Sequence, residues 1–286
     1  MPPSIRSMTD TDVDPASDMI LRGGWGDRRL FFAFSVRHPF CRPFVPGADG
    51  EIVATGVGTV NGSAGWIGAI FVDEAWRGRG LGRAVTDAVI DELGAAGCRT
   101  LVLVATDAGR RLYEPMGFEV ATWYRTFEAT GTAGTANALD DARPDGGTLR
   151  AFDSADLQAV KALDRAATGE DRAHLLDAFA TPQSARCLVG PRGHRLRGSV
   201  IRAPWGGGAT VATERDAGVA ICEARRRSAS TGRRVRAGLL LENEAGAAAL
   251  QRLGWTEAWR APRMHRGEAL VWQPTSIWGQ FNHALG

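Results

Sequence analysis

The pattern best suited to chemistry is a run of arginine and glycine, R-G-R-G-L-G-R, between Arg77 and Arg83. An apolar stretch ending at Val72 precedes the run, and helical spacing of apolar residues begins at Leu81. A glycine-rich turn between a strand and a helix exposes consecutive backbone N–H groups at the positive end of the helix dipole. Such a turn is suited to binding a pyrophosphate.

Two other phosphate-binding turns do not fit the sequence. A Walker loop ends in G-K-[ST], but the only lysine is Lys161, far from this turn. The dinucleotide fingerprint G-x-G-x-x-G would require glycine where Arg83 stands. Because nearly all of the 34 basic residues are arginine, an Arg/Gly pattern alone carries little weight. The placement of the turn between a strand and a helix carries the assignment.

The elements that would position this turn follow from hydrophobic periodicity. Alternating or continuous apolar runs predict strands, and apolar residues at helical spacing predict amphipathic helices. Asn61-Gly62-Ser63 predicts a hairpin between two of the strands. The predicted strands lie at 51–60, 66–73, 101–104 and 118–127, and the predicted helices at 10–21, 81–93 and 107–116.

An internal repeat predicts two domains. Residues 105–118 align without a gap on 242–255, an offset of 137, and each segment follows an apolar strand. Moreover, 286 residues exceed what one hydrophobic core usually organises. A stretch rich in threonine, glycine and alanine is the candidate linker. We expect an N-terminal domain at 1–130, a linker at 131–147 and a C-terminal domain at 148–286.

The order of elements, the Arg77–Arg83 turn and the segment Leu112–Phe118 (L-Y-E-P-M-G-F) resemble the GNAT superfamily of N-acetyltransferases. The chain resembles in particular two-domain bacterial members, to whose diverged second domain 164–176 and Arg263-Met264 are similar. This resemblance implies an α/β (α+β) fold of tandem GNAT-like domains. Each domain would have a mixed, mostly antiparallel central sheet flanked by helices.

The resemblance also implies acetyl-CoA as cosubstrate and assigns its site. The backbone of Phe71 and Val72 would pair with pantetheine and polarise the thioester carbonyl. Tyr113 corresponds to the tyrosine that protonates the departing thiolate, a role open to a phenol of ordinary pKa about 10. The residues that would bind the pyrophosphate are Arg77, Gly78, Arg79, Gly80, Leu81, Gly82 and Arg83.

The general base is not evident from the sequence. Many relatives have a glutamate on the fourth strand, but residues 66–71 contain no titratable side chain. Ordered water, Asp107 and His38 stay open as acceptors of the amine's proton. Spacing alone explains Asp107 as a helix N-cap.

The second copy lacks the features that mark the first. Tyr113 corresponds to Leu250, and residues 213–218 (T-E-R-D-A-G) lack the repeated glycines. We therefore expect the N-terminal domain to bind CoA and catalyse. The C-terminal domain would shape the acceptor site or have a purely structural role.

These observations favour an acetyl-CoA-dependent N-acetyltransferase that acts on a small-molecule amine by direct transfer in a ternary complex. One alternative is a non-catalytic CoA-binding sensor or interaction protein. Another is an acetyltransferase of a protein amine. The missing fourth-strand base motivates the first alternative.

Composition limits the partners. The net charge of +2 argues against nucleic acid, and no apolar run approaches the length of a membrane span. The five histidines have no ligand spacing, so no metal is expected. We expect a cytoplasmic protein, and a homodimer stays open as its assembly.

Overall fold

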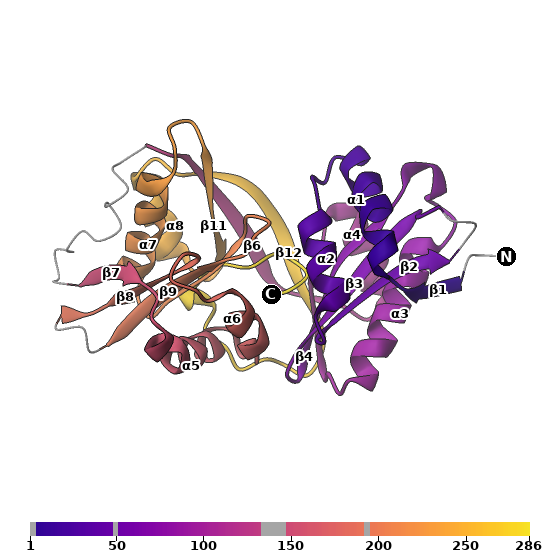
Figure 1. Cartoon of the computed structure of the whole chain (residues 1–286), viewed down its shortest axis with the longest axis horizontal. Coiled ribbons are helices and arrows are strands. Elements are labelled where there is room, and N and C mark those ends of the chain that lie inside the picture. The colour runs from indigo at the N-terminus through magenta and orange to yellow at the C-terminus, as the bar shows by residue number, and fades with distance from the viewer. Residues whose placement is uncertain (1–3, 48–50, 133–146, 192–194) are drawn as a thin grey trace. The chain divides into compact units, whose positions relative to one another are not determined.

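A computed structural model describes residues 4–47, 51–132, 147–191 and 195–286. The chain divides into two compact units (Figure 1). The first unit contains Met1–Glu119, Met264–Ala269 and Asn282–Gly286, and the second contains Val120–Arg263 and Leu270–Phe281. These units therefore do not coincide with a cut of the chain at residue 130. Most of the linker expected at 131–147 lies outside the described residues, so that boundary stays a prediction.

The first unit is built on a sheet with strand order β1-β2-β3-β4-β5. Neighbouring strands are antiparallel, except that β4 and β5 are parallel. After β5, the last residues of β12 return to this unit, where Thr100 Oγ1 donates to Glu268 O at 2.7 Å. Its elements are β1 (Ser4–Ser7), α1 (Val13–Arg22), α2 (Arg29–Arg37), β2 (Cys41–Gly47), β3 (Ala54–Asn61), β4 (Ala64–Val72), α3 (Leu81–Ala95), β5 (Thr100–Val104) and α4 (Asp107–Tyr113).

Helix α3 approaches the sheet closely because glycines on the strands leave room for its apolar stripe. A Cβ built on Gly56 would lie 2.4 Å from Val85, and one on Gly58 would lie 3.0 Å from Val89. Val85 and Val89 are four residues apart, so they share one helical face, and both are fully buried. The sheet therefore fixes where α3 begins, at the end of β4.

The second unit contains a five-stranded sheet with the order β13-β10-β9-β8-β7, and β6 pairs antiparallel with β11. Strand β6 thus belongs with the second copy, although it follows the first in the sequence. The elements are β6 (Glu119–Thr130), β7 (Thr148–Ala151), α5 (Leu157–Thr168), α6 (Ala173–Phe179), β8 (Ala185–Val189), β9 (Leu196–Arg202), β10 (Gly208–Ala212), α7 (Arg215–Ser228), β11 (Arg234–Leu240), α8 (Glu244–Arg252), β12 (Thr256–Gly267) and β13 (Ile277–Gly279).

The first pair of repeated caps lies at the starts of α4 and α8. Thr106 Oγ1 accepts a hydrogen bond from Gly109 N at 3.1 Å, and Asn243 Oδ1 accepts one from Gly246 N at 3.1 Å. The two caps are 137 residues apart, the offset predicted by the sequence alignment. The N-cap of α4 is therefore Thr106, and the expectation that Asp107 caps this helix is wrong.

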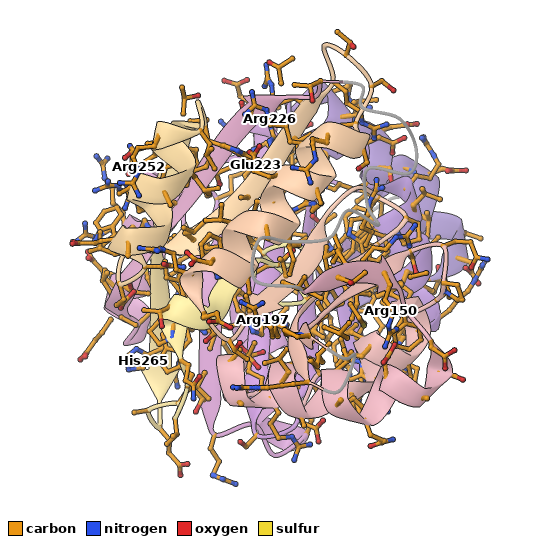
Figure 2. All side chains as sticks on the ribbon, turned by 90° about the vertical axis from the view of Figure 1, so that its left-hand side faces the viewer. Arg150, Arg197, Glu223, Arg226, Arg252 and His265 are labelled. Carbon is orange, nitrogen blue, oxygen red and sulfur yellow. The ribbon has the colours of Figure 1, made fainter. Side chains whose placement is uncertain are left out.

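A second repeated feature lies at the start of each copy and was not predicted from the sequence. Arg6 forms two hydrogen bonds with Asp12, at 2.7 and 2.8 Å. Arg150, which is labelled in Figure 2, forms two with Asp156, both at 2.7 Å. Each aspartate also accepts from the backbone N–H three residues earlier, at 2.8 Å. The hydrogen bonds from Arg6 hold the pKa of Asp12 down at about 2. The same strand-to-helix corner is thus built twice, which confirms the tandem fold.

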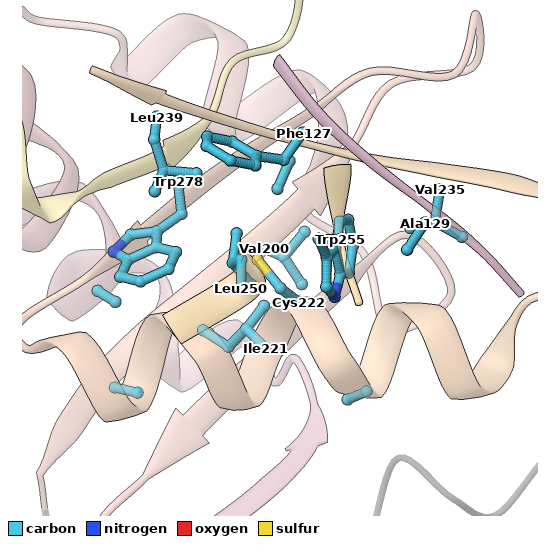
Figure 3. Packing of buried hydrophobic residues seen from close by; sticks show 14 of the residues in the cluster. Phe127, Ala129, Val200, Ile221, Cys222, Val235, Leu239, Leu250, Trp255 and Trp278 are labelled. Carbon is cyan, nitrogen blue, oxygen red and sulfur yellow. The ribbon is translucent and has the colours of Figure 1, made fainter. Parts of the chain in front are cut away.

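Trp278 on β13 is a fully buried side chain in the core of the second unit (Figure 3). Trp278 belongs to a cluster that includes Phe127 of β6, Leu239 of β11 and Leu250 of α8. A Cβ built on Gly218 of α7 would lie 2.0 Å from the indole ring. Gly218 is therefore the position at which α7 makes room for this tryptophan.

The strands predicted at 51–60, 66–73, 101–104 and 118–127, and the helices predicted at 10–21, 81–93 and 107–116, are confirmed within a few residues. Helix α2 was not predicted. Its sequence is crowded with phenylalanine and followed closely by Pro39 and Pro43, which obscures the helical period.

Substituting alanine for Gly218 tests the core of the second unit. We expect Gly218→Ala to lower the free energy of unfolding by about 1–3 kcal/mol, because the new methyl group overlaps a tryptophan that has no room to move. Gly94→Ala, within α3, is the matched control, since a Cβ there meets nothing within 4 Å. That change should be neutral or stabilise by about 0.5–1 kcal/mol. Equal effects in urea denaturation would contradict this packing.

Candidate active site

Strand β4 parts from β5 partway along its length. The two pair over three residues only, ending at Trp66 and Val102, whereas β4 continues to pair with β3 as far as Val72. A bulge bends β4 at Ala69, whose φ is 50°, and Thr55 Oγ1 donates to Ala69 O at 2.8 Å. Beyond Trp66, the edge of β4 that would face β5 has no described strand partner. Phe71 and Val72, the residues expected to contact pantetheine, lie at the open end.

The glycine turn follows directly and leads into α3. Gly78 and Gly80 have φ values of 74° and 81°, a region that L-residues with side chains rarely adopt, and Gly80 is the N-cap of α3. Buried Leu81 anchors the first helical position. The N–H groups of Leu81, Gly82 and Arg83 lie in the first turn, where an α-helix offers them no internal acceptor. The predicted turn therefore ends in a helix N-terminus, a type of site that can bind an anion.

Three exposed arginines surround this N-terminus. Arg77 Nε donates to Val72 O at 3.3 Å, and the Arg79 guanidinium lies 4.7 Å from the centroid of the Trp76 ring. Arg83 lies 3.5 Å from Asp87. Within the described part of the chain, Arg77 and Arg79 have no acidic partner. Their charge is therefore available to a bound phosphate.

Tyr113 is the last residue of α4 and is buried. Its ring contacts Phe118 edge-on, with 5.9 Å between centroids. Burial raises the pKa of Tyr113, so the phenol keeps its proton at neutral pH. Its hydroxyl forms no hydrogen bond with any described residue. Tyr113 is thus a neutral donor whose proton is not already committed.

The start of α3, the end of β4 and α4 meet at Gly82. A Cβ built there would lie 3.5 Å from Val72 and 3.6 Å from Leu112, which are ordinary contact distances. Leu112 is the neighbour of Tyr113 on α4. The fold therefore brings together the open end of β4, the glycine turn and the helix that carries Tyr113.

The face of β4 opposite α3 is flanked by two segments that are remote in the sequence. On one side, the Phe71 ring packs edge-on against Trp25 of the α1–α2 connection, with 5.3 Å between centroids. On the other, a Cβ built on Gly68 would lie 2.3 Å from the carbonyl oxygen of His283. Asn61 Nδ2 holds that second segment by donating to Leu285 O at 2.9 Å.

His38, one of the candidate bases, lies at the end of β4 far from Phe71. Its ring lies beside Phe34, with 4.5 Å between centroids, and the adjacent Phe40 accepts from Val60 N through its backbone carbonyl. Val60 pairs with Gly65, six residues before Phe71, which is about 20 Å along a strand.

Asp107, the other candidate base, is an exposed residue in the first turn of α4. His283, which the fold brings against β4, was not among the residues predicted from the sequence. Burial, together with the nearby charge of Arg28, lowers the pKa of His283 to about 4, so it is neutral at neutral pH. No short-range signal links residue 283 to residue 68, so the sequence alone could not have revealed this neighbour.

The second copy has neither the long turn before the helix nor the open strand edge. Only residues 213–214 separate β10 from α7, whereas residues 73–80 separate β4 from α3. Strand β13 pairs with β10 and also contacts β11, the counterparts of β4 and β5. Protein therefore occupies the place that stays open in the first copy.

Other reactive groups are few among the described residues. No three histidine, cysteine, aspartate or glutamate side chains gather there as they would to hold a metal ion. None of the described helices is both long and apolar enough to span a membrane. The four cysteines are thiols, and burial raises the pKa of Cys41 to about 11 and of Cys222 to about 12. Both are therefore poor nucleophiles.

Comparisons with known proteins agree with this geometry. The sequence profile of the Acetyltransferase (GNAT) family matches residues 9–118. No curated protein matches the chain. The fold resembles that of a candidate acetyltransferase from Pyrococcus horikoshii, with a TM-score of 0.78 and 20% identity over 99% of this chain and 95% of that one.

Two further solved structures resemble the whole chain. A GCN5-related N-acetyltransferase from Sphaerobacter thermophilus has a TM-score of 0.60 and 16% identity, over 94% of this chain and 98% of that one. A tandem GNAT protein from the clavulanic acid biosynthesis pathway has a TM-score of 0.61 and 15% identity, over 92% and 98%. Residues 9–118 therefore belong to the GNAT acetyltransferase family, and the chain as a whole has the tandem GNAT fold.

Proposed function

We propose that this protein is an acetyl-CoA-dependent N-acetyltransferase that transfers the acetyl group directly to a small-molecule amine in a ternary complex in the cytoplasm. One observation carries the proposal: the unpaired edge of β4 leads without interruption into a glycine turn and a helix N-terminus, beside the helix that carries Tyr113. An extended thioester cosubstrate with a pyrophosphate matches that sequence of groups.

The residues of the first unit fit such a cosubstrate. The N–H groups at the start of α3, with Arg77, Arg79 and Arg83, would hold the pyrophosphate. The free backbone edge of β4 would pair with the pantetheine amides, as a neighbouring strand would. At Phe71 and Val72, a backbone N–H would polarise the thioester carbonyl and stabilise the negative charge that develops on it.

Proton transfer completes the reaction. The amine attacks as the neutral form, a C–N bond forms, and the C–S bond breaks as Tyr113 donates its proton to the departing sulfur. The surplus proton of the amine passes to water, because β4 supplies no carboxylate. With their thiol pKa values raised by burial, Cys41 and Cys222 are poorly suited to carrying the acetyl group, which favours direct transfer.

The two alternatives account for less of the geometry. A CoA-binding sensor would use the same turn but gives no role to the unbonded hydroxyl of Tyr113. An acetyltransferase of a protein amine needs an open groove for a peptide. The α1–α2 connection and the segment Asn282–Gly286 instead flank the face of β4, which favours a small acceptor.

An assay of CoA release with a panel of amines tests the proposed function. We expect acetyl-CoA to bind and CoA to be released together with an acetylated product for at least one small amine. Tight binding of acetyl-CoA without turnover on any amine would instead support the sensor. Turnover confined to peptide or protein amines would instead support an acetyltransferase of a protein amine.

Replacing Gly80 by valine tests the turn. We expect the dissociation constant of acetyl-CoA to rise about tenfold or more, because the side chain crowds the approach to the helix N-terminus. Gly97→Val is the matched control: Gly97 follows the other end of α3, has a positive φ of 86°, and a Cβ there also meets nothing within 4 Å. Unchanged calorimetric binding in Gly80→Val would refute the assignment of the turn.

Tyr113→Phe tests the proton donor. The substitution removes the proton donor, so we expect kcat to fall about a hundredfold or more. It keeps the ring contact with Phe118, so the affinity for acetyl-CoA should stay the same. Tyr124→Phe removes the other buried tyrosine hydroxyl of the chain and should leave kcat unchanged. Parallel losses of turnover and affinity in Tyr113→Phe would indicate a packing role.

The stoichiometry of binding tests the difference between the two copies. We expect titration calorimetry to give one CoA per chain, because the second copy lacks the turn and β13 pairs with the edge of β10. Gly80→Val should weaken that single site. A second site that survives this substitution would show that the second copy also binds CoA.

A further inference from the structure

Arg28 and Arg29 are neighbours at the start of α2 with opposite environments. Arg29 is paired with three aspartates, Asp14 and Asp18 at 2.6 Å and Asp27 at 3.3 Å. The Arg28 guanidinium forms no hydrogen bond or ion pair with any residue that the structure describes. Its nearest acidic neighbour in the chain, Asp27, is already bonded to the backbone and side chain of Arg29.

The environment of Arg28 is unfavourable for an unpaired cation. The side chain is half-buried, and burial lowers the pKa of Arg28, although Asp27 opposes that shift. A guanidinium keeps its charge even so, because its ordinary pKa lies far above neutrality. Removing such a group from water costs free energy unless an anion pairs with it. The fold therefore retains a cation that none of the described residues pairs with.

Arg28 lies at the acceptor side of the proposed active site. Its charge acts on His283, whose backbone carbonyl abuts Gly68 of β4. Within the same α1–α2 connection, Trp25 packs against Phe71, the residue assigned to the thioester. Arg28 therefore lies in the connection that packs on Phe71 through Trp25, and its charge reaches the segment that packs on Gly68. An anion bound to this guanidinium would lie on the acceptor's side of β4.

We propose that Arg28 binds a carboxylate of the acceptor, so that the substrate is an amine that also carries a carboxylate, as an amino acid does. This inference rests on the proposed acetyltransferase function. The planar fork of N–H donors on arginine matches the two oxygens of a carboxylate. Trp25 and Phe71 supply an apolar wall for the part of the substrate between its two charged ends.

Matched acceptors test the inference. Each amino acid in the panel is compared with its amide and with its decarboxylated amine. We expect the wild-type kcat/KM to favour the acid, and Arg28→Gln to lower kcat/KM for the acid about 10- to 100-fold, mainly through KM, because a charge-assisted pair is lost. The values for the amide and the decarboxylated amine should stay unchanged. Arg28→Lys should restore part of the loss by returning the charge without the fork.

Arg29→Gln is the control, since it removes a neighbouring arginine whose partners all lie within the protein. It should leave the preference for the acid intact. Equal kcat/KM for acid and amide, or an acid preference that survives Arg28→Gln, overturns the inference and leaves the acetyltransferase function standing. Faster turnover of an aminoalkyl phosphate than of the matching acid overturns the carboxylate assignment. If no amine releases CoA, the proposed function fails, and this inference with it.

Discussion

The parting of β4 from β5 is the constraint on which the rest of the first unit depends. Backbone N–H and C=O groups that lose a strand partner must find another, because leaving them buried and unbonded is costly. After Trp66, β4 bends at Ala69 and its free edge continues to Val72. Val85 and Val89 hold α3 against the sheet, so the N-terminus of α3 lies at the end of the free edge of β4. The line of groups suited to an extended acyl carrier follows from one interrupted pairing.

In the second copy, another strand of the same chain pairs with the edge that corresponds to the free edge of β4. Strand β13 supplies β10 with hydrogen-bond partners, and Trp278 fills the space beside Gly218. The connection before α7 is correspondingly short, with two residues (213–214) against the eight (73–80) before α3. Two copies of one fold have thus diverged in what completes the sheet, which is a ligand in the proposed active site and protein in its counterpart. The same strand edge can thus either bind a ligand or be paired by another strand, which stabilises the fold.

Local features of the site could be predicted from the sequence, and long-range ones could not. The glycine turn and α3 depend on neighbouring residues, so periodicity and spacing reveal them. The cap before α4 was assigned one residue late, because threonine and aspartate both favour that position and only the structure separates Thr106 from Asp107. The contacts of Trp25 with Phe71 and of His283 with Gly68 join distant segments and leave no trace in spacing. These are the contacts that define the acceptor side.

In the proposed active site, burial shifts the pKa values of different groups in opposite directions. Burial raises the pKa of Tyr113 and lowers that of His283, and in both cases it favours the neutral form near pH 7. Arg28 cannot respond in this way, because a guanidinium keeps its proton. The permanent positive charge of Arg28 therefore acts on a histidine that burial has made neutral. Because Arg28 is half-buried, its interaction with a substrate anion is stronger than that of a fully exposed arginine. A half-buried arginine that no described residue pairs with is thus better suited to selecting a substrate than to stabilising the fold.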